Sequence, residues 1–151
     1  MNVNDICRQL LYKEEIRDVL HRYARASLLS DEAMKRSCWH PDGTDEHAGF
    51  VSGSIDEVMP VFMEMRKNIK LSHMCISNIT IKLDGDFADS ECFAVDCHVF
   101  EKEGVTYHFV SGGRFNDRFE RRNDEWRILH RKSIMDWSRI ERVNPNMPKP
   151  F

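Results

Sequence analysis

The chain has 151 residues, of which 41% are hydrophobic and 31% charged, a composition that suits one ordinary domain with a real core. Its 22 basic and 25 acidic residues give a formal charge of −3, which excludes a global field that would recruit nucleic acid or anionic lipid. No apolar stretch could span a bilayer, and the N-terminus is charged too early for a secretory signal. We therefore expect a cytoplasmic protein with neither nucleic-acid nor membrane partners.

The first predicted element is a helix from Asn4 to about Ser30. Its apolar residues recur at intervals of three and four, which places them on one face with Tyr23 near the middle. Leu28 falls toward the edge of this stripe and should border the same buried space. A short second helix is expected in "SDEAMKRSCW", which begins with a capping serine and ends before the proline of "HPDG".

Histidines and carboxylates gather in the next segment, "CWHPDGTDEHAGF": His40, Asp42, Asp45, Glu46 and His47. No HExxH pattern is present, and strand alternation would point neighbouring side chains apart. The five cysteines contain no CxxC pair, which favours reduced thiols over structural zinc or disulfides. We therefore expect no metal here, and the favoured interpretation is a turn with exposed acids.

A third helix is predicted in "SGSIDEVMPVFMEMRKNIK". Ser54 and Glu57 have the spacing of a capping box, and apolar residues that include Phe62 follow at helical intervals. Pro60 marks either the true start of the helix or a kink within it. Its methionine-rich face is interpreted as core packing.

After Lys70 the pattern changes to long strands separated by "DGD", "KEG" and "RND", which are turn sequences at hairpin spacing. Strands of this length must curl or bulge, and "SGG" before Arg114 supplies a place to bend. We predict one α+β domain over residues 1–151, with an extended tail from about residue 140. N-terminal helices should close a strongly curved, cone-shaped antiparallel sheet around a pocket.

His73 lies near the start of the largely apolar stretch "LSHMCISNITIKL". Counting by twos from His73 reaches Ile79, Ile81 and Leu83, so we expect it to point inward. Two interpretations stay open: a buried neutral histidine with one hydrogen-bond partner, which is the commoner case, or a catalytic base. Tyr23 raises the same pair of alternatives, because its hydroxyl needs a partner inside the helix stripe.

Two further sets of polar residues lie in the later strands. Asp96 and His98 are two residues apart and share a face, where a surface pair is favoured over a pocket pair. Arg131 and Asp136 in the last strand either anchor a polar ligand or form an ion pair at the rim of the cone. No phosphate-binding glycine loop or nucleophile elbow is present.

In order along the chain, "IRDVLHRYARASLLSDEAMKRSCWHPDG", "LSHMCISNITIKLDGDF" and "SGGRFNDRFERRNDEWRILHRKSIMDW" resemble the SnoaL-like branch of the nuclear-transport-factor-2-like superfamily. The resemblance covers roughly Ile16 to Arg139 and rests on the ordered set rather than on one motif. It implies a cone-shaped, cystatin-like fold with a deep pocket, usually in a homodimer or homotrimer. Its enzymes include scytalone dehydratase, bile-acid dehydratase and lindane dehydrochlorinase, most of which need no cofactor.

The resemblance also implies site residues. His73 falls at the family histidine, Tyr23 at a polar helix position that often faces the pocket, and Arg131 near an arginine of lindane dehydrochlorinase. These three are the catalytic candidates, and Leu28, His47, Phe62 and Asp136 are the candidate substrate contacts. Many lyases of the family pair the histidine with an aspartate, and that position falls on Leu28.

Two functions are therefore compatible with the sequence. The first is a lyase or isomerase of the dehydratase or cyclase type, in which His73 moves a proton on a small hydrophobic polycyclic or aromatic ligand, without a cofactor. The second is a non-catalytic binding module or helper subunit, as the beta subunit of ring-hydroxylating dioxygenases is. The missing aspartate favours the second, and the histidine and tyrosine favour the first.

Overall fold

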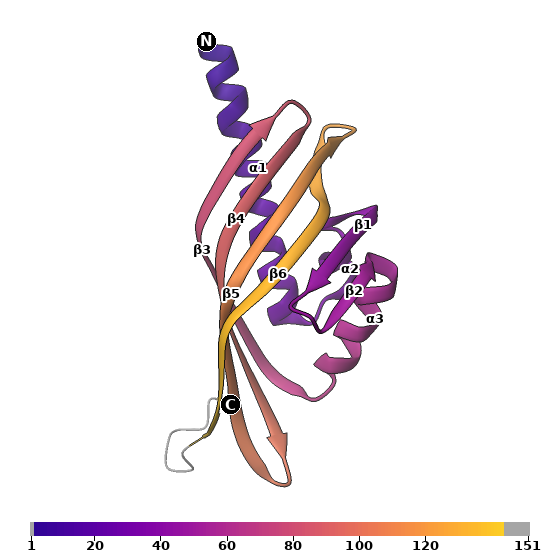
Figure 1. Cartoon of the computed structure of the whole chain (residues 1–151), viewed down its shortest axis with the longest axis vertical. Helices are drawn as coiled ribbons and strands as arrows, with labels where there is room; N and C mark the ends of the chain where they lie inside the picture. Colours follow the sequence, from indigo (N-terminus) through magenta and orange to yellow (C-terminus); the bar gives the residue numbers. More distant parts are fainter. Residues whose placement is uncertain (1, 144–151) are drawn as a thin grey trace.

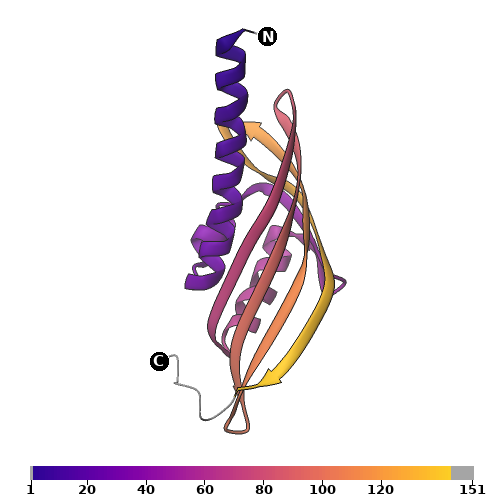
Figure 2. The ribbon, with the colours of Figure 1, turned by 90° about the vertical axis from the view of Figure 1, so that its left-hand side faces the viewer.

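A curved sheet with helices against it forms the protein (Figure 1). The computed structural model describes residues 2–143. Its elements in chain order are α1 (Val3–Leu29), α2 (Glu32–Arg36), β1 (Trp39–His47), β2 (Val51–Ser54), α3 (Ile55–Arg66), β3 (Ile69–Asp84), β4 (Phe87–Lys102), β5 (Val105–Arg122) and β6 (Glu125–Arg142). The predicted α+β class is confirmed, and the helices lie on the same side of the open, curved sheet (Figure 2).

The sheet has the strand order β2-β1-β6-β5-β4-β3. Strands β3 to β6 form the expected antiparallel meander, but β1 pairs with β6 in parallel. The predicted curved antiparallel sheet is confirmed, with this one parallel pairing as an exception. The segment expected to be a turn with exposed acids forms β1, which joins β2 to the sheet.

Three tight hairpins connect β3 to β6, as the turn sequences predicted. The pairing closes at Asp84–Phe87, Lys102–Val105 and Arg122–Glu125, which leaves two residues in each loop. Positive φ angles of 53° at Glu103 and 74° at Gly104 have the signs that a type I′ turn requires.

The core lies between α1 and the inner face of the sheet. Ile16, Leu20 and Tyr23 on the predicted stripe are almost fully buried, and Tyr23 meets the rings of Trp39 and Phe115 edge to face at 5.5 Å. Each large side chain buried in this way contributes roughly 1.5–3 kcal/mol. Burial of the tyrosine face of α1 therefore fixes the helix over the middle of the sheet.

Two glycines allow β5 to bend. The pairing of β5 with β6 shifts between Gly112 and Gly113, where the sequence predicted a bend. A Cβ atom on Gly113 would lie 2.0 Å from the Ile134 carbonyl oxygen, so only glycine fits this approach of two backbones. The bend turns both strands around the space in which the site lies.

Helix α3 begins with the predicted capping box: the Ser54 amide donates to the Glu57 carboxylate at 2.8 Å. The helix continues through Pro60, so this proline marks neither end. Strand β6 extends past residue 140 to Arg142, and the rest of the predicted tail, residues 144–151, lies outside the described residues. Within residues 2–143 no helix is both long and apolar enough to cross a bilayer.

Candidate functional site

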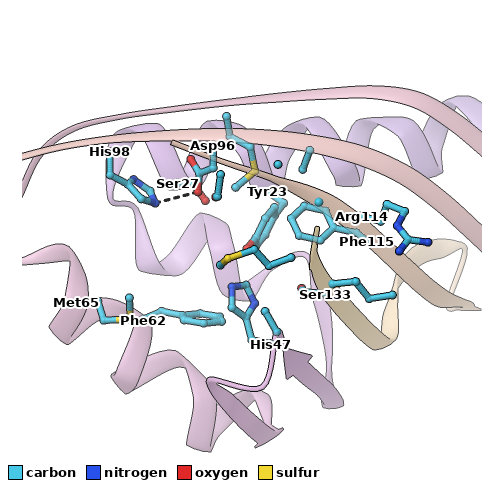
Figure 3. A pocket seen from close by; sticks show the side chains of 18 of the residues that line it. Tyr23, Ser27, His47, Phe62, Met65, Asp96, His98, Arg114, Phe115 and Ser133 are labelled. Carbon is cyan, nitrogen blue, oxygen red and sulfur yellow. Dashed lines mark ion pairs between the residues drawn. The ribbon is translucent and has the colours of Figure 1, made fainter. Parts of the chain in front are cut away.

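A cavity of about 130 Å³ opens between the end of α1, helices α2 and α3, and the inner face of the sheet (Figure 3). This volume exceeds the roughly 10–15 Å³ that one water needs, so a small organic molecule is a reasonable occupant. Apolar walls come from side chains such as Phe62, Met74 and Phe115. Polar side chains converge on the same space from α1, β1 and β4.

Asp96 and His98 form one polar wall. His98 Nε2 lies 2.9 Å from Asp96 Oδ2, and both residues line the cavity. Ser72 contacts His98 Nδ1, and Arg66 donates to the Ser72 hydroxyl. Because the Ser72 oxygen accepts from Arg66, the Ser72 hydroxyl can donate its own proton to His98 Nδ1. The ring proton of a neutral His98 then lies on Nε2, which donates to Asp96. The remaining carboxylate oxygen, Asp96 Oδ1, is buried and has no hydrogen-bond partner among the residues that the structure describes.

The favoured surface placement of Asp96 and His98 was therefore wrong, since the pair belongs to the pocket. Figure 3 shows both side chains on one side of the cavity and His47 on the other, with Tyr23 between them.

His47 stands in front of a buried carboxylate. Its Nδ1 lies 3.5 Å from Asp45 Oδ1, and its ring packs edge to face on Phe62 with centroids 4.7 Å apart. Asp45 is fully buried, and neither of its oxygens accepts a hydrogen bond within the described part of the chain. This leaves His47 Nε2 as the ring nitrogen available to a molecule in the cavity.

Tyr23 projects from α1 into the centre of the site. Burial raises the pKa of its hydroxyl above the ordinary value, an effect that the Arg131 charge opposes and the charges of Asp45 and Asp96 reinforce. The hydroxyl is therefore protonated across the neutral range and is a hydrogen-bond donor.

Two cations complete the cavity wall. Lys35 is 8% exposed and donates to Ser27 Oγ at 3.2 Å, and Arg66 donates to the Ser27 carbonyl oxygen. Burial, together with the neighbouring charge of Arg66, lowers the pKa of Lys35 to about 8. This end of the pocket therefore favours anionic or electrophilic groups.

Arg131 lies behind the site rather than in it. It is fully buried, and its Nε and one Nη donate to the two oxygens of Asp117 at 2.7 Å. Burial alone would lower the pKa of Arg131, but the Asp117 carboxylate raises it above the ordinary value, so the pair is ionised. The guanidinium lies 4.3 Å from the Tyr23 ring centroid. Arg131 thus packs against the ring of Tyr23. The structure shows neither the predicted ion pair at the rim nor a place for Arg131 in the cavity wall.

The expected inward orientation of His73 is wrong. His73 is exposed and does not line the cavity, whereas its neighbours Ser72 and Met74 point inward. A bulge between Ser77 and Thr80, with φ of 51° at Asn78, reverses the alternation of β3. Counting by twos back from Leu83 crosses this bulge and reaches the wrong face.

Leu28 and Asp136 also lie outside the cavity. Leu28 is 41% exposed because it lies about 140° around the helix from Tyr23, and Ser27 takes the pocket position instead. Asp136 is exposed and binds Arg114 through bonds of 2.9 and 3.1 Å at the pocket rim. The structure places His47, Phe62 and Tyr23 on the cavity wall, where their roles stay predictions.

Sequence reasoning missed three residues: Lys35, Arg66 and the buried Asp45. A usable signal was present for Asp45, because "DEH" at 45–47 and "DCH" at 96–98 repeat the same Asp-x-His spacing on strands. Nothing in the local pattern marks the two cations. Within residues 2–143 no three His, Cys, Asp or Glu side chains gather as a metal site.

A family model described as the SnoaL-like domain matches residues 8–132. The chain belongs to this family. The resemblance predicted from the sequence is thereby confirmed, and with it the placement in the nuclear-transport-factor-2-like superfamily. Among curated proteins, none matches the chain significantly.

Solved structures share the fold of this SnoaL-like protein at low identity. A putative scytalone dehydratase from Novosphingobium aromaticivorans has a TM-score of 0.79 and 14% identity, over 93% of this chain and 97% of that one. A type 2 hexachlorocyclohexane dehydrochlorinase has a TM-score of 0.79 and 12% identity, over 94% and 95%. A protein from Kribbella flavida has a TM-score of 0.76 and 16% identity, over 84% and 92%. These likenesses show that the chain shares the fold of these proteins.

Proposed function

We propose that this SnoaL-like protein is a lyase or isomerase that moves protons on a small hydrophobic molecule held in the cavity. One observation carries the proposal: a fully buried carboxylate, Asp45, lies behind the pocket histidine His47, and within residues 2–143 neither of its oxygens accepts a hydrogen bond. A buried charge without partners costs stability, and such arrangements concentrate at functional sites.

His47 is the proton acceptor in this proposal. Its Nε2 removes a proton from a carbon acid in the cavity, and the imidazolium that forms gains the Asp45 charge at Nδ1. The separation of 3.5 Å is long for a hydrogen bond, but contacts of this kind tighten when a ligand binds. General base catalysis by such a pair is worth about 10²–10⁴-fold.

The Tyr23 hydroxyl is the matching electrophile. Because its pKa is raised by burial, the hydroxyl keeps its proton and donates a hydrogen bond to a ligand oxygen on which negative charge develops. Asp96, with one free oxygen on the opposite side, can receive or return a second proton. Acceptors on two sides of one ligand suit both a proton shift and an elimination.

The apolar walls define the ligand class. Phe62, Met65, Ile69 and Met74 offer a hydrophobic surface, and Tyr23 and Lys35 offer donors to an oxygen. A compact aromatic or alicyclic molecule with one carbonyl or hydroxyl group fits this combination. Fold neighbours described as a dehydratase and a dehydrochlorinase add support for elimination chemistry.

Deuterium exchange at an enolisable ketone tests the proposal. The protein is incubated with 2-tetralone in deuterated buffer, and loss of the C1 proton signal is followed by NMR. We expect exchange well above that of buffer, and a decrease of about a hundredfold in His47→Gln. The exposed His73→Gln variant is the control and should exchange as the wild type does.

The second candidate is a non-catalytic binding module. A protein described as a putative aromatic ring hydroxylase shares the fold, with a TM-score of 0.72 and 16% identity. We therefore retain a helper subunit of such an enzyme as the alternative. Saturable binding of 2-tetralone without any exchange above buffer would favour it and overturn the proton-transfer role.

A further inference from the structure

The proton-transfer role uses Lys35 only as a hydrogen-bond donor to the ligand, but the position of its amine allows further chemistry. Helix α2 carries it, and Asp31 caps that helix by accepting from the Met34 amide at 2.9 Å. The predicted capping serine, Ser30, instead ends α1 in a left-handed conformation with φ of 55°. This tight junction turns α2 back so that the Lys35 side chain enters the cavity wall.

The amine lies among aromatic rings. Its Nζ is 4.8 Å from the Tyr23 ring centroid and 4.9 Å from that of Phe62, and its one hydrogen bond within residues 2–143 goes to Ser27 Oγ. No carboxylate of the described chain comes within 4.0 Å of the nitrogen to form an ion pair. A lysine is almost never buried in this way unless it is paired, so its cost in stability calls for a functional reason.

Burial and two nearby cations favour the neutral amine, whereas the charges of Asp96 and Asp45 oppose it. Burial and the nearby guanidinium of Arg66 lower the pKa of Lys35 to about 8, so a substantial fraction is unprotonated near neutrality. The ionisable groups that act on it come from the elements packed around α2: Tyr23 (α1), Asp45 (β1), Arg66 (α3), Asp96 (β4) and Arg131 (β6). A lysine in an apolar pocket beside a second cation is a recognised form of an activated nucleophile.

We propose that Lys35 is a covalent carbonyl-binding residue, and that the cavity takes aldehydes or ketones as imines on its side-chain nitrogen. The neutral nitrogen adds to the carbonyl carbon and gives a carbinolamine. Loss of the former carbonyl oxygen as water then leaves a carbon–nitrogen double bond. No oxidant, reductant or cofactor enters this step, since one amine and one carbonyl give one imine and one water.

The ligand class follows from the surroundings of the nitrogen. Tyr23 and Phe62 flank the amine and suit an aromatic or alicyclic carbonyl compound. The Ser27 hydroxyl stands beside the nitrogen and can relay the proton that the oxygen needs to leave. The inference shares the pocket with the proposed proton transfer but rests on it only for the ligand's location.

Reductive trapping tests this assignment. Benzaldehyde, which has no enolisable hydrogen, is added to the intact protein with sodium cyanoborohydride at about pH 7.5, and the modified lysines are found by peptide mass mapping. We expect a benzyl group on Lys35 at a rate at least about tenfold above that of exposed Lys67 and Lys132, because burial favours the neutral, nucleophilic form of the Lys35 amine.

Matched variants separate the possible outcomes. Lys35→Arg keeps the charge and cannot form an imine, so modification at this position should vanish while the circular dichroism spectrum is retained. Lys67→Met should leave Lys35 labelling unchanged. Trapping should persist in His47→Gln, whose loss of deuterium exchange tests the proposed function separately. Labelling of Lys35 no faster than that of Lys67 in the folded wild type would overturn the proposal.

Discussion

Asp45 and His47 lie on one face of β1, with the buried carboxylate 3.5 Å behind the imidazole that lines the cavity. This arrangement turns Nδ1 of the histidine toward the carboxylate and leaves its far nitrogen for a ligand. The second Asp-x-His pair, on β4, is arranged differently, because both nitrogens of His98 have partners and a carboxylate oxygen remains free.

Asp45→Asn should separate activity from stability. We expect deuterium exchange with 2-tetralone to fall by about tenfold or more, because the imidazolium at His47 loses its counter-charge. Unfolding in urea should show unchanged or higher stability, because a buried charge without hydrogen bonds is removed. Asp42→Asn is the control on the same strand, where the carboxylate is exposed and binds Arg122. Strong destabilisation by Asp45→Asn would identify a structural carboxylate instead.

Tyr23→Phe should remove the electrophile and keep the packing. The ring contacts with Trp39 and Phe115 remain, so the free energy of unfolding should change by no more than about 1 kcal/mol. Loss of one donor to a developing oxyanion should slow exchange by about a hundredfold. Tyr12→Phe alters a tyrosine that meets Trp126 edge to face away from the cavity, and it should leave the exchange rate unchanged.

Lys35 should make stability depend on alkaline pH. Its pKa is lowered from 10.5 to about 8 in the folded state, so between these values the unfolded chain binds more protons and stability rises with pH. The buried positive charge therefore costs most below about pH 8. Comparing the wild type with Lys35→Met cancels the other titrations. The variant's relative advantage in free energy of unfolding should shrink by about 2 kcal/mol from about pH 7 to pH 9.5. A difference that is constant with pH would contradict the lowered pKa.

Gly112 and Gly113 should tolerate alanine very differently. In Gly113→Ala the new methyl would meet the Ile134 carbonyl oxygen at 2.0 Å, and backbone cannot move aside cheaply, so we expect a loss of at least about 2 kcal/mol in urea unfolding. In Gly112→Ala it would meet the indole of Trp137, which is 47% exposed and can rotate away. Equal losses in both variants would refute the backbone argument.

The buried Arg131–Asp117 pair should be costly to break and cheap to replace. Arg131→Met leaves Asp117 as an unpaired buried charge, for which about 3–5 kcal/mol is expected in urea unfolding. Arg131→Met combined with Asp117→Leu should recover most of that loss. The double variant should also keep the exchange activity. Neither Arg131 nor Asp117 lines the cavity, and an apolar side chain can still pack against the Tyr23 ring.

Local patterns in the sequence predicted the helices, the hairpins and the fold class. The α1 stripe through Tyr23 and the two-residue turns depend on neighbours along the chain, and both appear where the patterns placed them. The prediction of side-chain orientation on β3 was wrong, because Asn78 adopts a positive φ that a rule of strict alternation does not anticipate. Because of this bulge, Ser72 rather than His73 points to the inner face of the sheet.

The rest of the site could not be predicted from local patterns, because it depends on contacts between residues far apart in the sequence. The parallel contact of β1 with β6 turns "DEH" from an apparent acidic turn into a buried carboxylate and a pocket imidazole. Lys35 enters the cavity because α2 folds back on Ser27. This packing depends on the one turn that connects α1 and α2. Both depend on tertiary packing, which periodicity within a single element does not encode.

Pairing of β1 with β6 also orders events during synthesis of the chain. Thr44 to His47 gain their parallel partners only at His130 to Ser133, near the end of the described strands. A nascent chain that has left the ribosome only as far as β5 can form its helices and first hairpins, because these contacts are local. The wall that carries Asp45 and His47 has to wait for the final strand, so we expect the complete cavity to form only after β6 has been synthesised.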